Sequence, residues 1–204
     1  MASSDAIACL KRGQRPTPPR PRPCLEAEFR LPAHINRQRP AEFRRADHSV
    51  STADRQALAT LTRDTDIPVM VDESVFTLND AWHLTAERAV DILSVYPGKH
   101  AGIQATVEIA NVAKAAGIKC SMGSNLELGI GTAAMLQVGA AISTIDSERF
   151  PGDFIGPIYH ETDLLKTPLT LGPEAARVPD GPGLGVELDE ELLLRYRDAS
   201  TIPT

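Results

Sequence analysis

The chain has 204 residues and a formal net charge of −6 at pH 7, and 42% of its residues are hydrophobic. This length and composition are typical of one globular domain, with or without an added tail. No stretch approaches the roughly 18 apolar residues of a membrane span, and the N-terminus lacks a secretory pattern, so we expect no membrane partner. Cys9, Cys24 and Cys120 have no metal-type spacing and cannot all pair, which favours the reducing cytoplasm.

Charge and proline are unevenly distributed along the chain. Residues 1–49 carry 10 Lys and Arg, 5 Asp and Glu, and 7 of the 16 prolines, whereas residues 50–204 carry 11 basic and 22 acidic residues. The first segment has no sustained period, so we predict a disordered extension at 1–49 and a folded part at 50–204. A basic arm for nucleic acid would need more aromatic residues than Phe29 and Phe43, so we predict no nucleic-acid partner.

From residue 50 onward the pattern becomes regular. Ser51 or Thr52 is a candidate N-cap for a helix that ends near Thr62. The elements predicted next are a strand at 67–71, a helix at 77–88, a strand at 91–96, a helix at 103–117, a strand at 118–122 and a helix at 130–144. Gly117 is predicted to be the C-cap of the second of these three helices.

Residues 146–204 are richer in loops. Short strand-like pieces lie at 169–171 and 178–180, and Leu188, Leu192 and Leu193 indicate a short helix near the C-terminus. The repeated strand–helix units before this segment are typical of parallel β/α structure. They are too few for an eight-fold barrel, so we predict an α/β fold that is a partial (β/α) barrel.

Polar residues follow each of the three predicted strands. They are Asp72, Glu73 and Ser74 after the first, Lys99 and His100 after the second, and Ser124, Asn125 and Glu127 after the third. Catalytic groups of β/α barrels gather at the C-terminal ends of the strands. Carboxylates and an ammonium group at one rim can bind a hard divalent cation and move a proton. An ordinary polar turn after each strand is the simpler alternative.

These strand ends lie within motifs that resemble a known family. The segments are VMVDES at 69–74, KHAGI at 99–103, GSNLELGIGTAA at 123–134 and VPDGPGLGVELDEELL at 178–193. Together they resemble the C-terminal barrel half of the mandelate racemase/muconate lactonizing enzyme group of the enolase superfamily. The resemblance covers about residues 50–197.

The resemblance implies a modified (β/α) barrel with a capping domain. Members of the group abstract a proton α to a carboxylate and stabilise the resulting enediolate with Mg²⁺. The family's third metal-binding carboxylate matches Asp72, and the acid that reaches toward the substrate matches Glu127. The resemblance therefore implies Asp72 as a Mg²⁺ ligand, Glu127 as a catalytic acid and a small carboxylate as substrate.

The acid/base lysine of the family is displaced in this chain. Aligned from Asp72, the family lysine at the end of the sixth strand falls at Tyr96, three residues before Lys99. Three interpretations stay open: Lys99 bends back into the pocket, Tyr96 takes the proton-transfer role, or the site works from one side only. A one-sided site suits dehydration or cycloisomerisation better than racemisation. His100 is interpreted as a loop residue.

The family's first two metal carboxylates and its Lys-x-Lys motif have no match in residues 1–49, where Lys11 is the only lysine. One carboxylate alone does not hold Mg²⁺ well. We therefore hypothesise a truncated or frame-shifted copy in which family sequence resumes near Val50.

Two functional hypotheses follow from the resemblance. The first is a Mg²⁺-dependent lyase or isomerase of the cycloisomerase, acid dehydratase or racemase type. The second is a catalytically inactive fragment without an intact metal site. Metal dependence distinguishes them. A homo-oligomer is expected from the resemblance alone.

Overall fold

The structure is a computed structural model that describes residues 28–30, 54–172 and 175–199. Its strands are β1 (Glu28–Arg30), β2 (Met70–Val71), β3 (Ile92–Val95), β4 (Lys119–Met122) and β5 (Ala175–Arg177). Its helices are α2 (Arg55–Asp64), α3 (Leu78–Ala86), α4 (Ile103–Ala116), α5 (Gly129–Ala141), the short 3₁₀ helix η1 (Gly156–Tyr159) and α6 (Glu190–Ala199).

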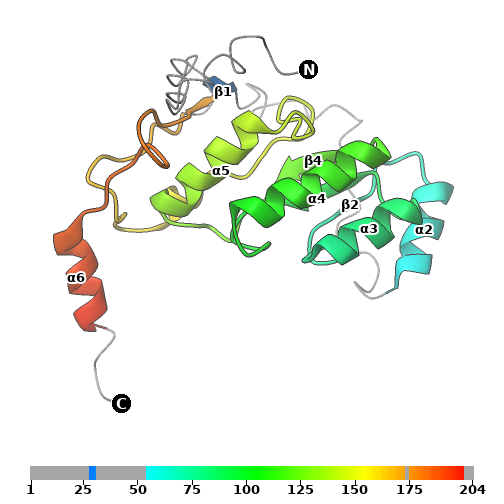
Figure 1. Ribbon diagram of the computed structural model, residues 1–204, viewed down its shortest axis with the longest axis horizontal. Coiled ribbons are helices and arrows are strands. Elements are labelled where there is room, and N and C mark those ends of the chain that lie inside the picture. The colour runs from blue at the N-terminus through cyan, green and yellow to red at the C-terminus, as the bar shows by residue number, and fades with distance from the viewer. Residues whose placement is uncertain (1–27, 31–53, 173–174, 200–204) are drawn as a thin grey trace, which may run out of the picture.

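A parallel sheet with the strand order β2-β3-β4 organises the fold. Met70 lies opposite Ile92, and Ser94 lies opposite Ser121. The helices α3, α4 and α5 follow β2, β3 and β4 in turn, and α4 packs against α3, β3 and β4 (Figure 1). This arrangement confirms the predicted α/β fold of parallel β/α units.

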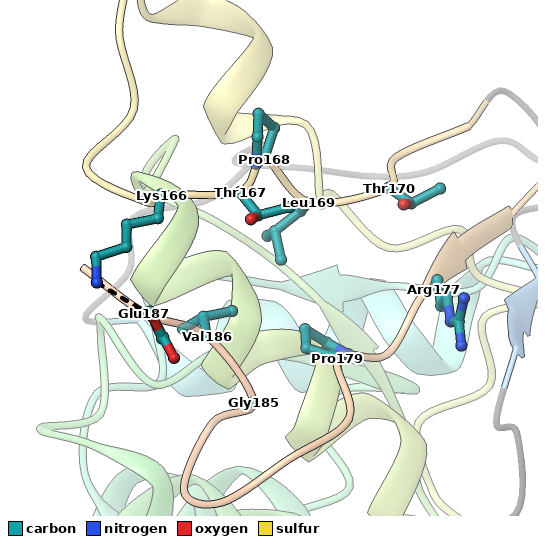
Figure 2. Close-up of a pocket in the computed structure, with 10 residues that line it drawn as sticks. All are labelled: Lys166, Thr167, Pro168, Leu169, Thr170, Arg177, Pro179, Gly185, Val186 and Glu187. Atoms are coloured by element: carbon teal, nitrogen blue, oxygen red, sulfur yellow. Dashed lines mark hydrogen bonds and ion pairs between the residues drawn. The ribbon is translucent and has the colours of Figure 1, made fainter. Parts of the chain in front are cut away.

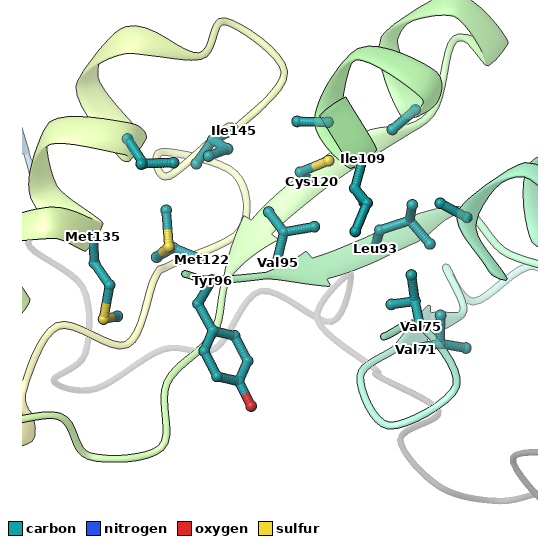
Figure 3. Packing of buried hydrophobic residues seen from close by; sticks show 14 of the residues in the cluster. Val71, Val75, Leu93, Val95, Tyr96, Ile109, Cys120, Met122, Met135 and Ile145 are labelled. Carbon is teal, nitrogen blue, oxygen red and sulfur yellow. The ribbon is translucent and has the colours of Figure 1, made fainter. Parts of the chain in front are cut away.

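The core lies between the sheet and its helices. Leu93 and Val95 of β3 and Cys120 and Met122 of β4 are almost fully buried and belong to this core. Tyr96 lies at one edge of this cluster with its ring pointing away (Figure 3). Within the described residues, no helix is long and apolar enough to cross a membrane.

Local side-chain and backbone caps fix the helix ends. The Thr77 hydroxyl accepts a hydrogen bond from the Asp80 N–H at 3.2 Å, and the Asp80 carboxylate accepts one from the Thr77 N–H at 2.8 Å, so a capping box begins α3. Gly117 ends α4 with a φ of 74°, which confirms the predicted C-cap.

The predicted cap of the first helix, Ser51 or Thr52, is wrong. Asp54 caps α2, because its carboxylate accepts a hydrogen bond from the Ala57 N–H at 2.9 Å. Aspartate is as strong an N-cap as serine and stands closer to the first helical residue. Residues 51–53 themselves lie outside the described part of the chain.

The first strand is shorter than predicted. The sequence indicates a strand at 67–71, but β2 holds only Met70 and Val71. Pro68 has no N–H to donate to a neighbouring strand. The Val69 N–H is used by a side chain, since it donates to the Asp91 carboxylate at 2.8 Å.

In the C-terminal part the predicted short helix is confirmed, but the strand lies at a different position from those predicted. Helix α6 contains Leu192 and Leu193, whereas Leu188 precedes it and bridges to Leu165. The strand β5 lies between the predicted pieces at 169–171 and 178–180. Alternating apolar residues in such short runs do not fix where pairing occurs.

Strand β1 falls in the segment for which the sequence predicts no regular structure. It pairs antiparallel with β5, and Glu28 lies opposite Arg177. The rest of 1–49 lies outside the described residues, so its predicted disorder stays a prediction.

Candidate functional site

The candidate site is a rim formed by the segments that follow β2, β3 and β4. Because the three strands are parallel, their C-terminal ends lie at the same edge of the sheet. Asp72 follows β2, Tyr96 and Lys99 follow β3, and Glu127 follows β4. These four side chains are those that the sequence and the resemblance single out.

Lys99 bends back toward the sheet and binds the end of β2. Its Nζ donates to the Asp72 carboxylate, to the Asp72 backbone carbonyl at 2.9 Å and to the Ser94 carbonyl at 2.8 Å. The Lys99 side chain is 2% exposed and that of Asp72 is 24% exposed. The ion pair is therefore largely withdrawn from water.

Two aromatic rings complete the surroundings of the Lys99 ammonium. Its Nζ lies 4.8 Å from the ring centroid of Tyr96 and 6.0 Å from that of Phe76. Both distances are within the range of cation–π attraction. Burial lowers the pKa of Lys99, while the hydrogen bond and charge of Asp72 act in the opposite direction.

Tyr96 stands between Lys99 and the loop after β4. Its hydroxyl donates a hydrogen bond to the Asn125 side-chain oxygen at 3.1 Å. Burial, followed by the negative charges of Asp72 and Glu127, raises the pKa of Tyr96 to about 12. The phenol is therefore neutral near pH 7, and it can donate a hydrogen bond or a proton but is a poor base.

We expect Tyr96 to remain un-ionised up to about pH 11, because a phenol with this raised pKa loses its proton later than a free tyrosine. The measurement is the ultraviolet absorbance of tyrosinate during an alkaline titration of the wild type and of Tyr96→Phe. The two curves should coincide between about pH 9 and 11. A wild-type curve that exceeds the variant by one of the three tyrosines in this interval would contradict the assignment.

Glu127 is folded against its own loop and against the turn after β3. One carboxylate oxygen, Oε2, accepts a hydrogen bond from the Asn125 N–H at 2.9 Å. The other, Oε1, is buried and has no hydrogen-bond partner within the described part of the protein. A Cβ at position 98 would lie 2.5 Å from this oxygen, so Gly98 allows the close approach. Glu127 therefore has one carboxylate oxygen at the rim that accepts no hydrogen bond from the described residues.

His100 is a buried structural residue. It is 2% exposed, and its Nδ1 lies 2.9 Å from the Phe76 carbonyl oxygen. Burial lowers the pKa of His100, which favours the neutral ring. This geometry agrees with its interpretation as a loop residue, and the contact with Phe76 joins the turns after β2 and β3.

Sequence reasoning missed two groups that support the rim. The Ser124 hydroxyl donates to the Asp153 carboxylate at 2.8 Å, and the Asp153 N–H donates to the Met122 carbonyl at 2.9 Å. Phe76 contributes an aromatic face and a carbonyl. The Pro-Gly-Asp segment at 151–153 indicates a loop, but nothing in the local pattern marks Asp153 or Phe76 as a neighbour of the rim.

A pocket that none of the four rim side chains lines is formed by the C-terminal segment (Figure 2). Its two cationic residues are already paired: Lys166 with Glu187 at 3.2 Å, and Arg177 with Asp180 at 3.5 Å. Both basic side chains are more than half exposed. Exposed paired charges of this kind do not define a binding site.

The described residues do not fit a magnesium site on their own. They contain no group of three or more His, Cys, Asp or Glu side chains that could hold a metal ion. Asp72 is engaged by the Lys99 ammonium. Mg²⁺ prefers octahedral oxygen coordination with one or two carboxylates plus further oxygen ligands, so Asp72 alone is a poor donor set.

The fold and the rim define a part of a (β/α) barrel whose polar groups gather at the strand ends. Comparison with known protein families identifies the family to which this domain belongs. Residues 48–192 match the family model described as enolase C-terminal domain-like, and the chain belongs to this family. This finding confirms the resemblance noted in the sequence motifs.

The chain is similar to cycloisomerases in sequence and in structure. It is 38% identical over 134 residues to muconate cycloisomerase 1 of Rhodococcus opacus, covering 66% of this chain and 35% of that enzyme. The structure of 2-chloromuconate cycloisomerase from Rhodococcus opacus 1CP aligns with a TM-score of 0.70 and 29% identity, over 74% of this chain and 40% of that one.

A relative with another activity is also similar. The L-Ala-D/L-Glu epimerase from Bacillus subtilis aligns with a TM-score of 0.63 and 31% identity, over 69% of this chain and 38% of that one. The chain thus spans about two fifths of the length of the relatives that it matches. These matches show the family of this chain.

Proposed function

We propose that this chain forms part of an isomerase or lyase site of the cycloisomerase type that moves a proton α to the carboxylate of a small substrate. The observation that carries the proposal is the rim itself, where the Asp72–Lys99 pair, the Tyr96 hydroxyl and the Glu127 carboxylate come from three adjacent strand ends. Support also comes from the similarity to muconate and chloromuconate cycloisomerases.

The side chains suggest distinct tasks. Tyr96 is a neutral hydrogen-bond and proton donor, because its pKa is raised to about 12. Glu127 is the carboxyl group on the substrate side, and its buried Oε1 accepts no hydrogen bond from the described residues. Lys99 supplies fixed positive charge beside Tyr96, which favours negative charge that develops on a substrate carboxylate. A single neutral proton donor suits a one-sided reaction such as cycloisomerisation, in which the carbon α to the carboxylate receives one proton.

The proposal includes a dependence of the activity on Mg²⁺, and the ion would have to be held by residues outside the described part of the chain. Members of the superfamily stabilise an enediolate with this ion, and the described residues lack the ligands for it. Full activity of the cycloisomerase type therefore needs carboxylates that the described part of the chain does not supply. A cytoplasmic location and a homo-oligomer stay predictions.

The test is an assay with muconate as the probe substrate, followed by proton NMR in D₂O so that turnover and deuterium incorporation are both visible. We expect the wild type to accelerate deuterium incorporation even where turnover is low for lack of further metal ligands, and Tyr96→Phe to reduce that rate by about 10²–10⁴ because a positioned proton donor is removed. Tyr159→Phe is the matched control, since Tyr159 is 64% exposed on η1 and should not affect the rate. Equal rates for wild type and Tyr96→Phe would refute the role of Tyr96.

A catalytically inactive domain is the second candidate. The specific observation in its favour is that Asp72, the only strand-end carboxylate matched to a metal ligand, is bound by Lys99 rather than left open. On this hypothesis the same assay shows no turnover and no deuterium incorporation at any Mg²⁺ concentration.

A further inference from the structure

The Lys99 ammonium is saturated with hydrogen-bond acceptors. A lysine ammonium carries three N–H donors and no acceptor. Its three partners in the structure are the Asp72 carboxylate, the Asp72 carbonyl and the Ser94 carbonyl. Each donor thus has a partner, and two of the three partners are backbone atoms that cannot swing away.

The turn after β3 positions this lysine by main-chain hydrogen bonds. The Lys99 N–H donates to the Tyr96 carbonyl at 3.2 Å, and the Gly102 N–H donates to the Pro97 carbonyl at 2.9 Å. Gly102 has a φ of 115°, a conformation that favours glycine. The side chain then returns to the carbonyl of Ser94, five residues earlier. The fold therefore fixes the position of the ammonium group, which does not behave as a mobile surface side chain.

The surroundings of the ammonium leave little room for exchange with water. The Lys99 side chain is 2% exposed, and the faces of Tyr96 and Phe76 lie beside it. A cation that has lost its hydration shell in this way needs the Asp72 carboxylate as its counter-ion.

A divalent ion at Asp72 would compete with this arrangement. The Oδ1 atom of Asp72 already accepts from the Lys99 ammonium, and the charge of the ion would repel this nearby ammonium. The ion would gain few other ligands, because the described residues hold no cluster of three metal-binding side chains.

We propose that Lys99 is the built-in cation of this rim, and that Asp72 binds its ammonium in place of Mg²⁺. The rim then keeps a positive charge beside Tyr96 without a bound metal ion. This inference holds whether or not the protein turns over a substrate, because it concerns only which cation Asp72 binds.

The experiment is a proton–nitrogen NMR spectrum of the lysine ammonium groups in the 204-residue chain. We expect a slowly exchanging Lys99 resonance that is missing in Lys99→Arg. Its position and intensity should stay unchanged up to about 10 mM MgCl₂, about ten times the Kd of a millimolar site. KCl at matched ionic strength is the control for charge screening.

Two results would overturn the proposal. One is the absence of any protected Lys99 ammonium resonance in the wild type. The other is a shift or loss of that resonance with MgCl₂ but not with KCl, which means that the metal displaces the lysine. Where Lys99→Arg does not fold, the resonance is assigned through the side-chain carbons of Lys99 in the wild type, so the test remains decisive.

Discussion

Asp72→Asn is expected to lower the free energy of unfolding by about 2–3 kcal/mol, because it leaves the buried Lys99 ammonium without its counter-ion. Breaking a fully buried pair costs about 3–5 kcal/mol. We place the effect below that range because the Asp72 side chain is 24% exposed and partly screened by water. Urea unfolding measures the loss.

A double variant separates the ion pair from simple truncation. Lys99→Met with Asp72→Asn removes both charges, so it should be more stable than Asp72→Asn alone. Glu187→Gln is the matched control, because it removes the exposed Lys166–Glu187 pair and should change stability by less than about 1 kcal/mol. Equal losses for Asp72→Asn and Glu187→Gln would mean that the rim pair is no stronger than a surface pair.

Gly156→Ala is expected to destabilise the protein by about 1–3 kcal/mol, as overpacking of a close contact does. A Cβ at this position would lie 2.2 Å from the Glu127 carbonyl oxygen and 2.7 Å from the Glu127 nitrogen. These are backbone atoms, so they cannot rotate away. The loop that carries Glu127 must shift, and the Thr132 hydroxyl would lose its 3.0 Å hydrogen bond to that carbonyl.

Gly98→Ala is the matched control for this prediction, because it approaches the same residue from the other side. Its Cβ would meet the carboxylate end of Glu127, which a side-chain rotation relieves. Urea unfolding should therefore show a smaller loss for Gly98→Ala than for Gly156→Ala. The reverse order would show that the Glu127 loop is not held against η1 as the structure describes.

The fold was predictable because its main signals are local. Apolar strands alternating with helical segments predicted the parallel units, and Gly117 marked the end of α4, where the structure gives it an αL conformation. The placement of Asp72 and Glu127 at strand ends followed from the same periodicity. Boundaries were less predictable, since Asp54 and Ser51 are comparable caps and only the folded chain selects between them.

The contacts of the rim were not predictable, because they depend on side-chain reach and on distant segments. Lys99 stands three residues beyond the position that the family pattern assigns to a lysine, and only its long side chain returns it to Ser94 and Asp72. Asp153, in the loop after α5, and Gly156, at the start of η1, approach the rim from a segment far along the chain. No local pattern encodes such long-range packing.

A crystal structure of the chain grown with Mn²⁺, used as a detectable substitute for Mg²⁺, tests the central claim most directly. The account predicts the Lys99 Nζ on the Asp72 carboxylate, the Asp72 carbonyl and the Ser94 carbonyl, with no anomalous metal signal at Asp72. A metal ion within coordination distance of Asp72, with Lys99 displaced, would contradict it. In that case the rim depends on a bound metal for its positive charge.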